Sequence, residues 1–96
     1  MFEIHLAETA TAQFDLLRSD RNYAIRVKAV EKTLEYLTNP KHPGLQSHEF
    51  ISLHGPHGEK VFESYAQQNT PAAYRIFWHY GPNRKQITVV AITAHP

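Results

Sequence analysis

The chain has 96 residues, of which 42% are hydrophobic, and this is enough for one compact domain over residues 1–96 and too little for two. The absence of cysteine excludes disulfides, thiolate metal ligands and catalysis by a cysteine nucleophile. A formal net charge of +1 is too small for broad electrostatic capture of nucleic acid, so any RNA contact must come from locally grouped cations.

The first part of the chain predicts a strand followed by two helices. Apolar and polar residues alternate over 2–6, which favours a half-exposed strand, and apolar residues recur at helical spacing over 7–18. A polar break follows, in which Asp20 or Asn22 is a candidate N-cap. The second helix has one apolar stripe, made of Tyr23, Val27, Val30, Leu34 and Leu37. Asn39-Pro40 ends it.

The rest of the chain predicts four strands. Residues 47–53 and 60–67 flank a proline- and glycine-containing turn, and residues 74–80 and 87–92 flank another. The order β-α-α-β-β-β-β indicates an α+β domain, with two N-terminal helices packed on one face of a mainly antiparallel sheet. The opposite face is then free to bind a ligand.

Arg75 and His95 are the first candidates for function. Alternation predicts that Arg75, Phe77 and His79 project from the open face of their strand. On the last strand, it places Val89 with Ala91, Thr93 and His95, and opposite Val90, Ile92 and Ala94. Arginine binds phosphate through a planar fork of donors, and histidine exchanges a proton near neutral pH. The other interpretation of Arg75 is a structural ion pair with Glu49, Glu59 or Glu63.

The strand over 60–67 adds three candidates. Glu63 can accept the proton of an RNA 2′ hydroxyl, Tyr65 can stack on a base, and Lys60 can contact RNA. From the residues alone, an ordinary solvated strand face with an aromatic cross-strand pair is the favoured interpretation of Glu63 and Tyr65. The strand register does not follow from the sequence, so a meeting of Arg75 with His95 is a hypothesis.

No cofactor or metal is expected. His42, His48, His54 and His57 lie in or near predicted loops, at spacings that match no helix-borne metal motif. The sequence has no Gly-rich phosphate loop, nucleophile elbow or dinucleotide fingerprint. It also has no apolar run of membrane-spanning length and no signal-peptide pattern, so we expect a cytoplasmic protein without membrane contact.

Taken together, several segments resemble the RelE/ParE superfamily of bacterial toxin–antitoxin toxins, and the resemblance covers nearly the whole chain. The segments are Val30-Glu31-Lys32-Thr33-Leu34 with Asn39-Pro40, Leu53-His54-Gly55, Lys60-Val61-Phe62-Glu63-Ser64-Tyr65, Tyr74-Arg75-Ile76-Phe77-Trp78 and Ile87-Thr88-Val89-Val90-Ala91-Ile92. The Tyr-Arg strand is the most characteristic of them.

The resemblance implies a type II toxin that cleaves ribosome-bound mRNA by metal-free acid–base catalysis, with a cognate antitoxin as its partner. It implies that Arg75 contacts the scissile phosphate and that His95 is the general acid. Glu63 would be the general base, and Lys60, Tyr65 and His79 would bind the substrate. The family often has lysine or arginine near the positions of Glu63 and Tyr65, and this chain departs from that pattern. Two alternatives stay open: a ParE-like non-catalytic inhibitor of DNA gyrase, and a non-toxic binding member of the same fold.

Overall fold

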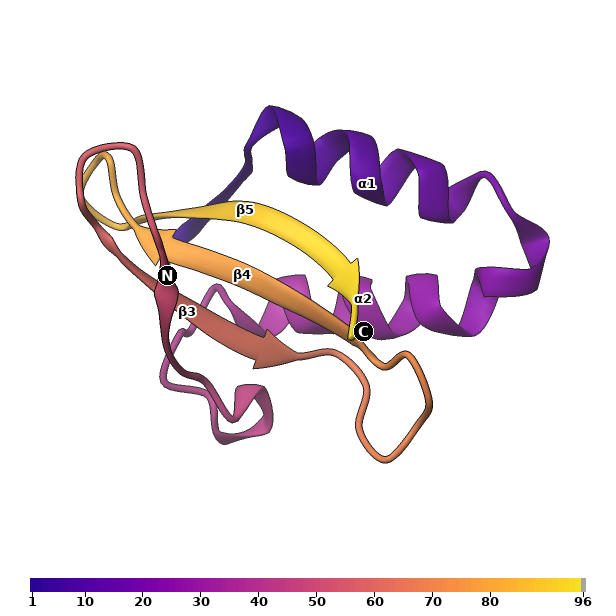
Figure 1. Cartoon of the computed structure of the whole chain (residues 1–96). Helices are drawn as coiled ribbons and strands as arrows, with labels where there is room; N and C mark the ends of the chain where they lie inside the picture. The colour runs from indigo at the N-terminus through magenta and orange to yellow at the C-terminus, as the bar shows by residue number, and fades with distance from the viewer. Residues whose placement is uncertain (96) are drawn as a thin grey trace.

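Two α-helices lie along one face of a five-stranded sheet (Figure 1). The computed structural model describes residues 1–95 of the chain. Its elements are β1 (Glu3–Leu6), α1 (Glu8–Arg18), η1 (Arg21–Tyr23), α2 (Ala24–Tyr36), η2 (Pro43–Leu45), β2 (His48–His54), β3 (Lys60–Tyr65), β4 (Tyr74–Tyr80) and β5 (Gln86–Ala94). This confirms the predicted α+β class. The helices, however, are not N-terminal, because β1 precedes them and they connect it to β2.

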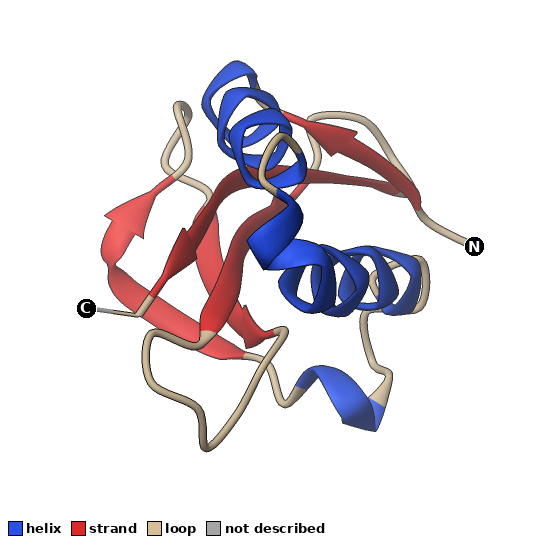
Figure 2. Cartoon of the chain, turned by 90° about the vertical axis from the view of Figure 1, so that its right-hand side faces the viewer, coloured by secondary structure: helices blue, strands red, loops and turns tan. Residues whose placement is uncertain are grey.

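The strands are arranged in the order β1-β5-β4-β3-β2. Strands β2 to β5 pair antiparallel with their neighbours, whereas β1 pairs with β5 in parallel. The two helices cross one face of the sheet between β1 and β2, which lie at its opposite edges (Figure 2). The sequence analysis left the position of the first strand in the sheet open.

Apolar side chains of both helices form the core with the facing side chains of β4 and β5. Helix α1 contributes Ala10, Phe14 and Leu17, all buried. From the predicted stripe of α2, Val30 and Leu37 are fully buried, while Tyr23 remains 37% exposed. The sheet residues of this core include Ile76, Trp78, Ile87, Val89 and Ile92. Among residues 1–95, no helix is long and apolar enough to cross a membrane.

Polar residues mark the ends of the helices. Glu8 lies in the first turn of α1 and Arg18 in its last, where each charge interacts favourably with the helix dipole. The carboxylate of Asp20 accepts a hydrogen bond of 2.9 Å from the backbone N–H of Asn22. Asp20 therefore caps a helix as predicted, although the helix is the short η1 and not α2 itself.

A β-bulge in β5 determines which side chains reach each face. Phe77 pairs with Ala91 and Trp78 with Val89, so Val90 has no partner on β4. The bulge turns Val89 toward the helices, and Val89 and Ile92 are both buried in the core. The prediction that Val89 shares a face with Ala91 was therefore wrong, because simple alternation takes no account of an inserted residue.

Candidate functional site

Three ionisable side chains meet on the open face, the sheet face opposite the helices. Arg75 on β4 donates from Nη1 to Oε2 of Glu63 on β3 at 2.6 Å. Nε2 of His48 on β2 lies 2.7 Å from the other oxygen of the same carboxylate, within ion-pair distance. The Glu63 side chain is only 3% exposed and that of Arg75 15%, whereas that of His48 is 50% exposed. The interpretation of Arg75 as an ion-pair residue is confirmed, with Glu63 as its partner.

Aromatic rings hold the guanidinium of Arg75 in place. Its carbon lies 4.8 Å from the ring centroid of Phe77 and 5.9 Å from that of Phe50, which suits a cation–π interaction. Phe50 and Phe77 are in edge-to-face contact at 4.8 Å. Nε of Arg75 is buried and has no hydrogen-bond partner in the described part of the chain. The guanidinium thus has a fixed position and a donor for which residues 1–95 supply no acceptor.

Tyr65 and His95 complete the group. Tyr65 is directly opposite Arg75, and Arg75 is opposite Thr93, so the register brings the end of β5 beside this pair. The ring centroids of Tyr65 and His95 are 6.5 Å apart, with 25° between the planes. The backbone N–H of His95 donates to the carbonyl of Ala73 at 2.8 Å, which fixes the residue after the strand has ended. We call His48, Glu63, Tyr65, Arg75 and His95 the open-face cluster.

Two predicted site residues lie apart from the open-face cluster. Lys60 is exposed at the other end of β3, opposite His54, and alternation puts it on the face of Phe62 and not that of Glu63. His79 is on the open face but is only 2% exposed. Its Nδ1 donates to the carbonyl of Tyr80 at 2.8 Å, so Nδ1 carries the proton.

His48 and Phe50 are the residues that the sequence analysis missed. His48 was grouped with histidines of nearby loops, yet it pairs directly with Glu63 in the sheet. Alternation along 48–51 was the available signal, because it places His48 and Phe50 on one face. It could not indicate their partners, since the register between β2 and β3 includes an irregularity between Glu49 and His54.

Backbone N–H groups stabilise a carboxylate in the β2–β3 turn. Those of Glu59 itself and of His57 lower the pKa of the Glu59 carboxyl below its ordinary value of 4.5, with smaller contributions from the charges of His79 and His57. The N–H of His57 donates to Oε1 of Glu59 at 2.8 Å. Gly55 packs against this side chain so closely that a Cβ would collide with it. The carboxylate thus stabilises the turn.

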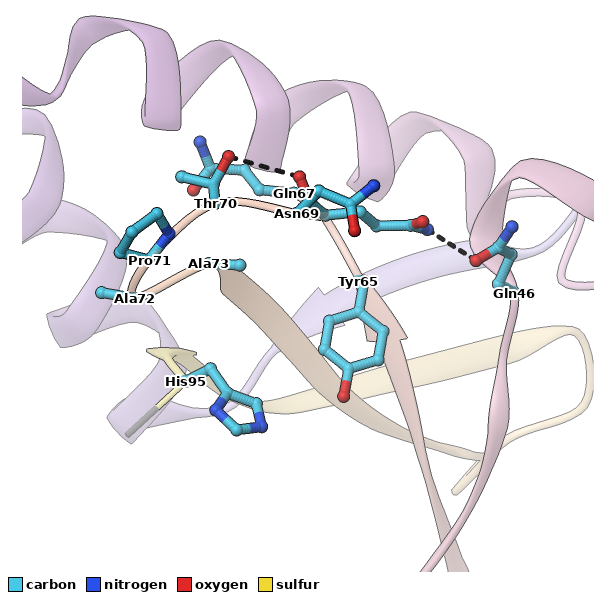
Figure 3. Close-up of a pocket in the computed structure, with 10 residues that line it drawn as sticks. Gln46, Tyr65, Gln67, Asn69, Thr70, Pro71, Ala72, Ala73 and His95 are labelled. Carbon is cyan, nitrogen blue, oxygen red and sulfur yellow. Dashed lines mark hydrogen bonds between the residues drawn. The ribbon is translucent and has the colours of Figure 1, made fainter.

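A pocket of about 500 Å³ opens beside the open-face cluster (Figure 3). It lies along the loop of residues 66–73, which connects β3 to β4, and we call it the loop pocket. Tyr65 and His95 line both the pocket and the cluster. The polar part of its wall consists largely of amide side chains, those of Gln46, Gln67, Gln68 and Asn69. Within the described chain, no group of three or more histidine, aspartate or glutamate side chains converges as a metal site would.

Comparison with known proteins supports the fold. No protein-family model matches this chain, and no curated protein sequence matches it. Among solved structures, the chain is similar to a copper-bound mutant toxin from Helicobacter pylori. The two are 14% identical, the alignment covers 99% of this chain and 96% of the other, and the TM-score is 0.63. Because sequence identity this low supports a conclusion about the fold alone, we conclude only that the chain has a toxin-like fold.

Proposed function

We propose that this protein is the toxin of a type II toxin–antitoxin system, of the RelE/ParE kind, and that it cleaves ribosome-bound mRNA in the cytoplasm. The observation that carries the proposal is the gathering of four side chains on the open face: Glu63 and Tyr65 on β3, Arg75 on the adjacent β4, and His95 just beyond the end of β5. These side chains supply a phosphate-binding cation, a carboxylate base, an aromatic ring and a proton donor. Metal-free RNA cleavage needs such groups.

The proposed reaction assigns one role to each residue. Glu63 accepts the proton of the 2′ hydroxyl, whose oxygen attacks the adjacent phosphorus. The bond between phosphorus and the 5′ oxygen breaks, and His95 donates a proton to that oxygen as it leaves. Arg75 stabilises the charge on the phosphate oxygens, and the product carries a 2′,3′-cyclic phosphate.

The contacts of Glu63 determine how substrate enters. One of its oxygens accepts a hydrogen bond from Arg75, and the other is in ion-pair contact with His48. The pair with Arg75 is buried, whereas His48 is half exposed at the edge of the sheet. Movement of His48 is therefore the step that frees an oxygen of Glu63 for the 2′ hydroxyl. Lys60 lies outside the open-face cluster, so its proposed contact is with RNA beyond the cleaved bond, and that of His79 requires its buried ring to become accessible.

The buried ion pair also favours a second candidate, a non-toxic binding protein of the same fold. A guanidinium neutralised by a buried carboxylate is less available to phosphate than a free one. This candidate predicts normal growth when the protein is expressed without any partner. A gyrase inhibitor predicts DNA damage signalling with intact mRNA.

His95→Gln gives the sharpest test of the proposed enzyme, because His95 is exposed and its replacement leaves the core intact. Induced expression of the wild-type protein should arrest growth and cut transcripts, and co-expression of the antitoxin should relieve the arrest. His95→Gln should reduce cleavage by about 10² to 10⁴ fold, the usual contribution of a general acid. Growth curves and sequencing of transcript 5′ ends measure both effects.

A matched control is His5→Gln, an exposed histidine on the edge strand β1 that pairs with Thr88 near the start of β5, whereas His95 follows the end of β5. It should leave growth arrest and cleavage unchanged, since its contact with Glu3 is on the surface. Toxicity that persists undiminished in His95→Gln would rule out the acid role, and intact transcripts under growth arrest would point to gyrase.

A further inference from the structure

The loop pocket differs from the open-face cluster in the chemistry of its wall. Of the described residues that line it, none carries a permanent charge, whereas four carry side-chain amides. A phosphate would find no cation there. The edge of a nucleobase, by contrast, presents neutral donors and acceptors that amide groups match.

Two of the amides bond to each other and leave a donor and an acceptor that no other residue of 1–95 uses. Nε2 of Gln68 donates to Oε1 of Gln46 at 2.6 Å. That bond leaves Oε1 of Gln68 to accept and Nε2 of Gln46 to donate. An acceptor beside a donor matches the N6 amino group and N7 of adenine, the pattern that glutamine and asparagine read in nucleic acids. On this edge guanine presents two acceptors, N7 and O6, and cytosine and uracil have no N7. Discrimination therefore requires that the base turn this edge, and not its Watson–Crick edge, toward the amides.

Other contacts stabilise the loop that carries Gln68. Gln67 is anchored, because its Oε1 accepts from the backbone N–H of Tyr74 at 3.1 Å and its own N–H donates to the carbonyl of Tyr74 at 3.2 Å. Asn69 and Ala72 have φ values of 56° and 54°. A left-handed alanine is unfavourable, and such conformations are concentrated at binding sites. The loop therefore has a specific shape.

The aromatic rings connect the pocket to the open-face cluster. Tyr65 and His95 present nearly parallel ring faces with centroids 6.5 Å apart, and both border the pocket (Figure 3). Bases of single-stranded RNA stack on such rings. A base in the pocket would thus belong to a nucleotide next to the phosphate at Arg75.

We propose that the loop pocket binds the base of an adenine nucleotide in single-stranded RNA, with Gln68 and Gln46 reading its edge and Tyr65 stacking on its face. This deepens the proposed RNA cleavage and rests on it for its biological role. It predicts that the protein selects RNA by base at one position.

Binding of non-cleavable RNA tests the pocket directly. The probes are four fluorescein-labelled trinucleotides with 2′-O-methyl groups on every sugar, which differ only in a central A, G, C or U. Fluorescence anisotropy with the purified full chain should show at least about fivefold tighter binding of the A probe, the lower limit for one good amide–base pair. Gln68→Ala and the similarly sized Gln68→Leu, which both lack the acceptor, should remove this preference.

The matched control is Asn22→Ala, which removes an exposed amide in η1 on the helix side of the molecule and should keep the preference. Circular dichroism checks that each variant is folded. Equal affinity for the four probes, no binding of any probe, a preference for another base, or a preference for A that survives both Gln68 substitutions would each overturn the proposal.

Transcript mapping separates this inference from the proposed function. Cleavage in cells without base-selective binding would support the proposed enzyme activity and rule out the adenine pocket. Base-selective binding that depends on Gln68, without cleavage in cells, would support the adenine pocket and rule out the proposed enzyme activity.

Discussion

At the scale of single residues, Glu63 is held by two side chains at once. The carboxylate is almost completely buried, and Arg75 and His48 each occupy one of its oxygens. Removal of one member of a buried ion pair leaves an uncompensated charge, which costs about 3–5 kcal/mol. The site therefore depends on the same contacts that stabilise the sheet.

Arg75→Ala is expected to lower the free energy of unfolding by about 3–5 kcal/mol, because it leaves the buried charge of Glu63 without its partner. Glu63→Ala/Arg75→Ala should cost less than the sum of the single substitutions, since neither charge then remains buried alone. Urea denaturation of the four proteins measures the coupling. Strictly additive effects would show that the pair contributes no mutual stabilisation.

Glu59 gives a prediction about pH. Its pKa is lower in the folded protein than the ordinary 4.5, mainly because backbone N–H groups of Glu59 and His57 bind the charged form. The stabilisation is therefore present above the unfolded pKa, and it is lost as the pH falls through the folded value. At pH 7, the urea concentration at the midpoint of unfolding should be lower for Glu59→Gln than for the wild type. The difference should shrink once the pH falls below 4.5, and a difference independent of pH would exclude this cause.

At the scale of elements, the bulge in β5 decides where His95 lies. Val90 has no partner across the ladder, so its deletion should leave Val89 and Ile92 facing the helices and His95 on the open face. Deletion of Thr93, which pairs with Arg75, should instead turn His95 toward the helix side.

We therefore expect the Val90 deletion to change the stability by no more than about 2 kcal/mol and to retain RNA cleavage. The Thr93 deletion should abolish cleavage. Transcript 5′-end mapping and urea denaturation measure the two effects. Equal losses of cleavage in both folded variants would show that the face on which His95 lies is unimportant.

Patterns along the chain predicted the helices and the last hairpin but not the contacts between strands. The stripe ending in Leu37 located α2, because helical spacing is a local property. The partners of Glu63 depend on the register of β2, β3 and β4, and a local pattern carries no information about the register. Alternation within a strand grouped Glu63 with Tyr65 and put Arg75 on the open face. For the same reason, it left the meeting of Arg75 with His95 a hypothesis and did not identify His48 as a partner of Glu63.

At the scale of the whole molecule, one core joins both helices to the sheet. Leu37 and Trp78 are buried in the same cluster, and Nε1 of Trp78 donates to Oγ of Ser64 at 2.9 Å. Leu37→Ala should lower the free energy of unfolding by about 2–5 kcal/mol, a large share of the total for a domain of this size. Fluorescence of Trp78, the single tryptophan, and circular dichroism should report one coincident transition. Separate transitions would mean that the helices and the sheet unfold independently.

The parallel pairing of β1 with β5 has a practical consequence for handling the protein. The backbone N–H of Glu3 donates to the carbonyl of Lys85 at 2.8 Å, so the N-terminus lies at the start of β5, whereas His95 follows its end (Figure 1). An affinity tag fused before Met1 would hang from the sheet far from Tyr65 and His95. The same tag fused after the C-terminus would be tethered beside them. It would obstruct the surface to which RNA is proposed to bind.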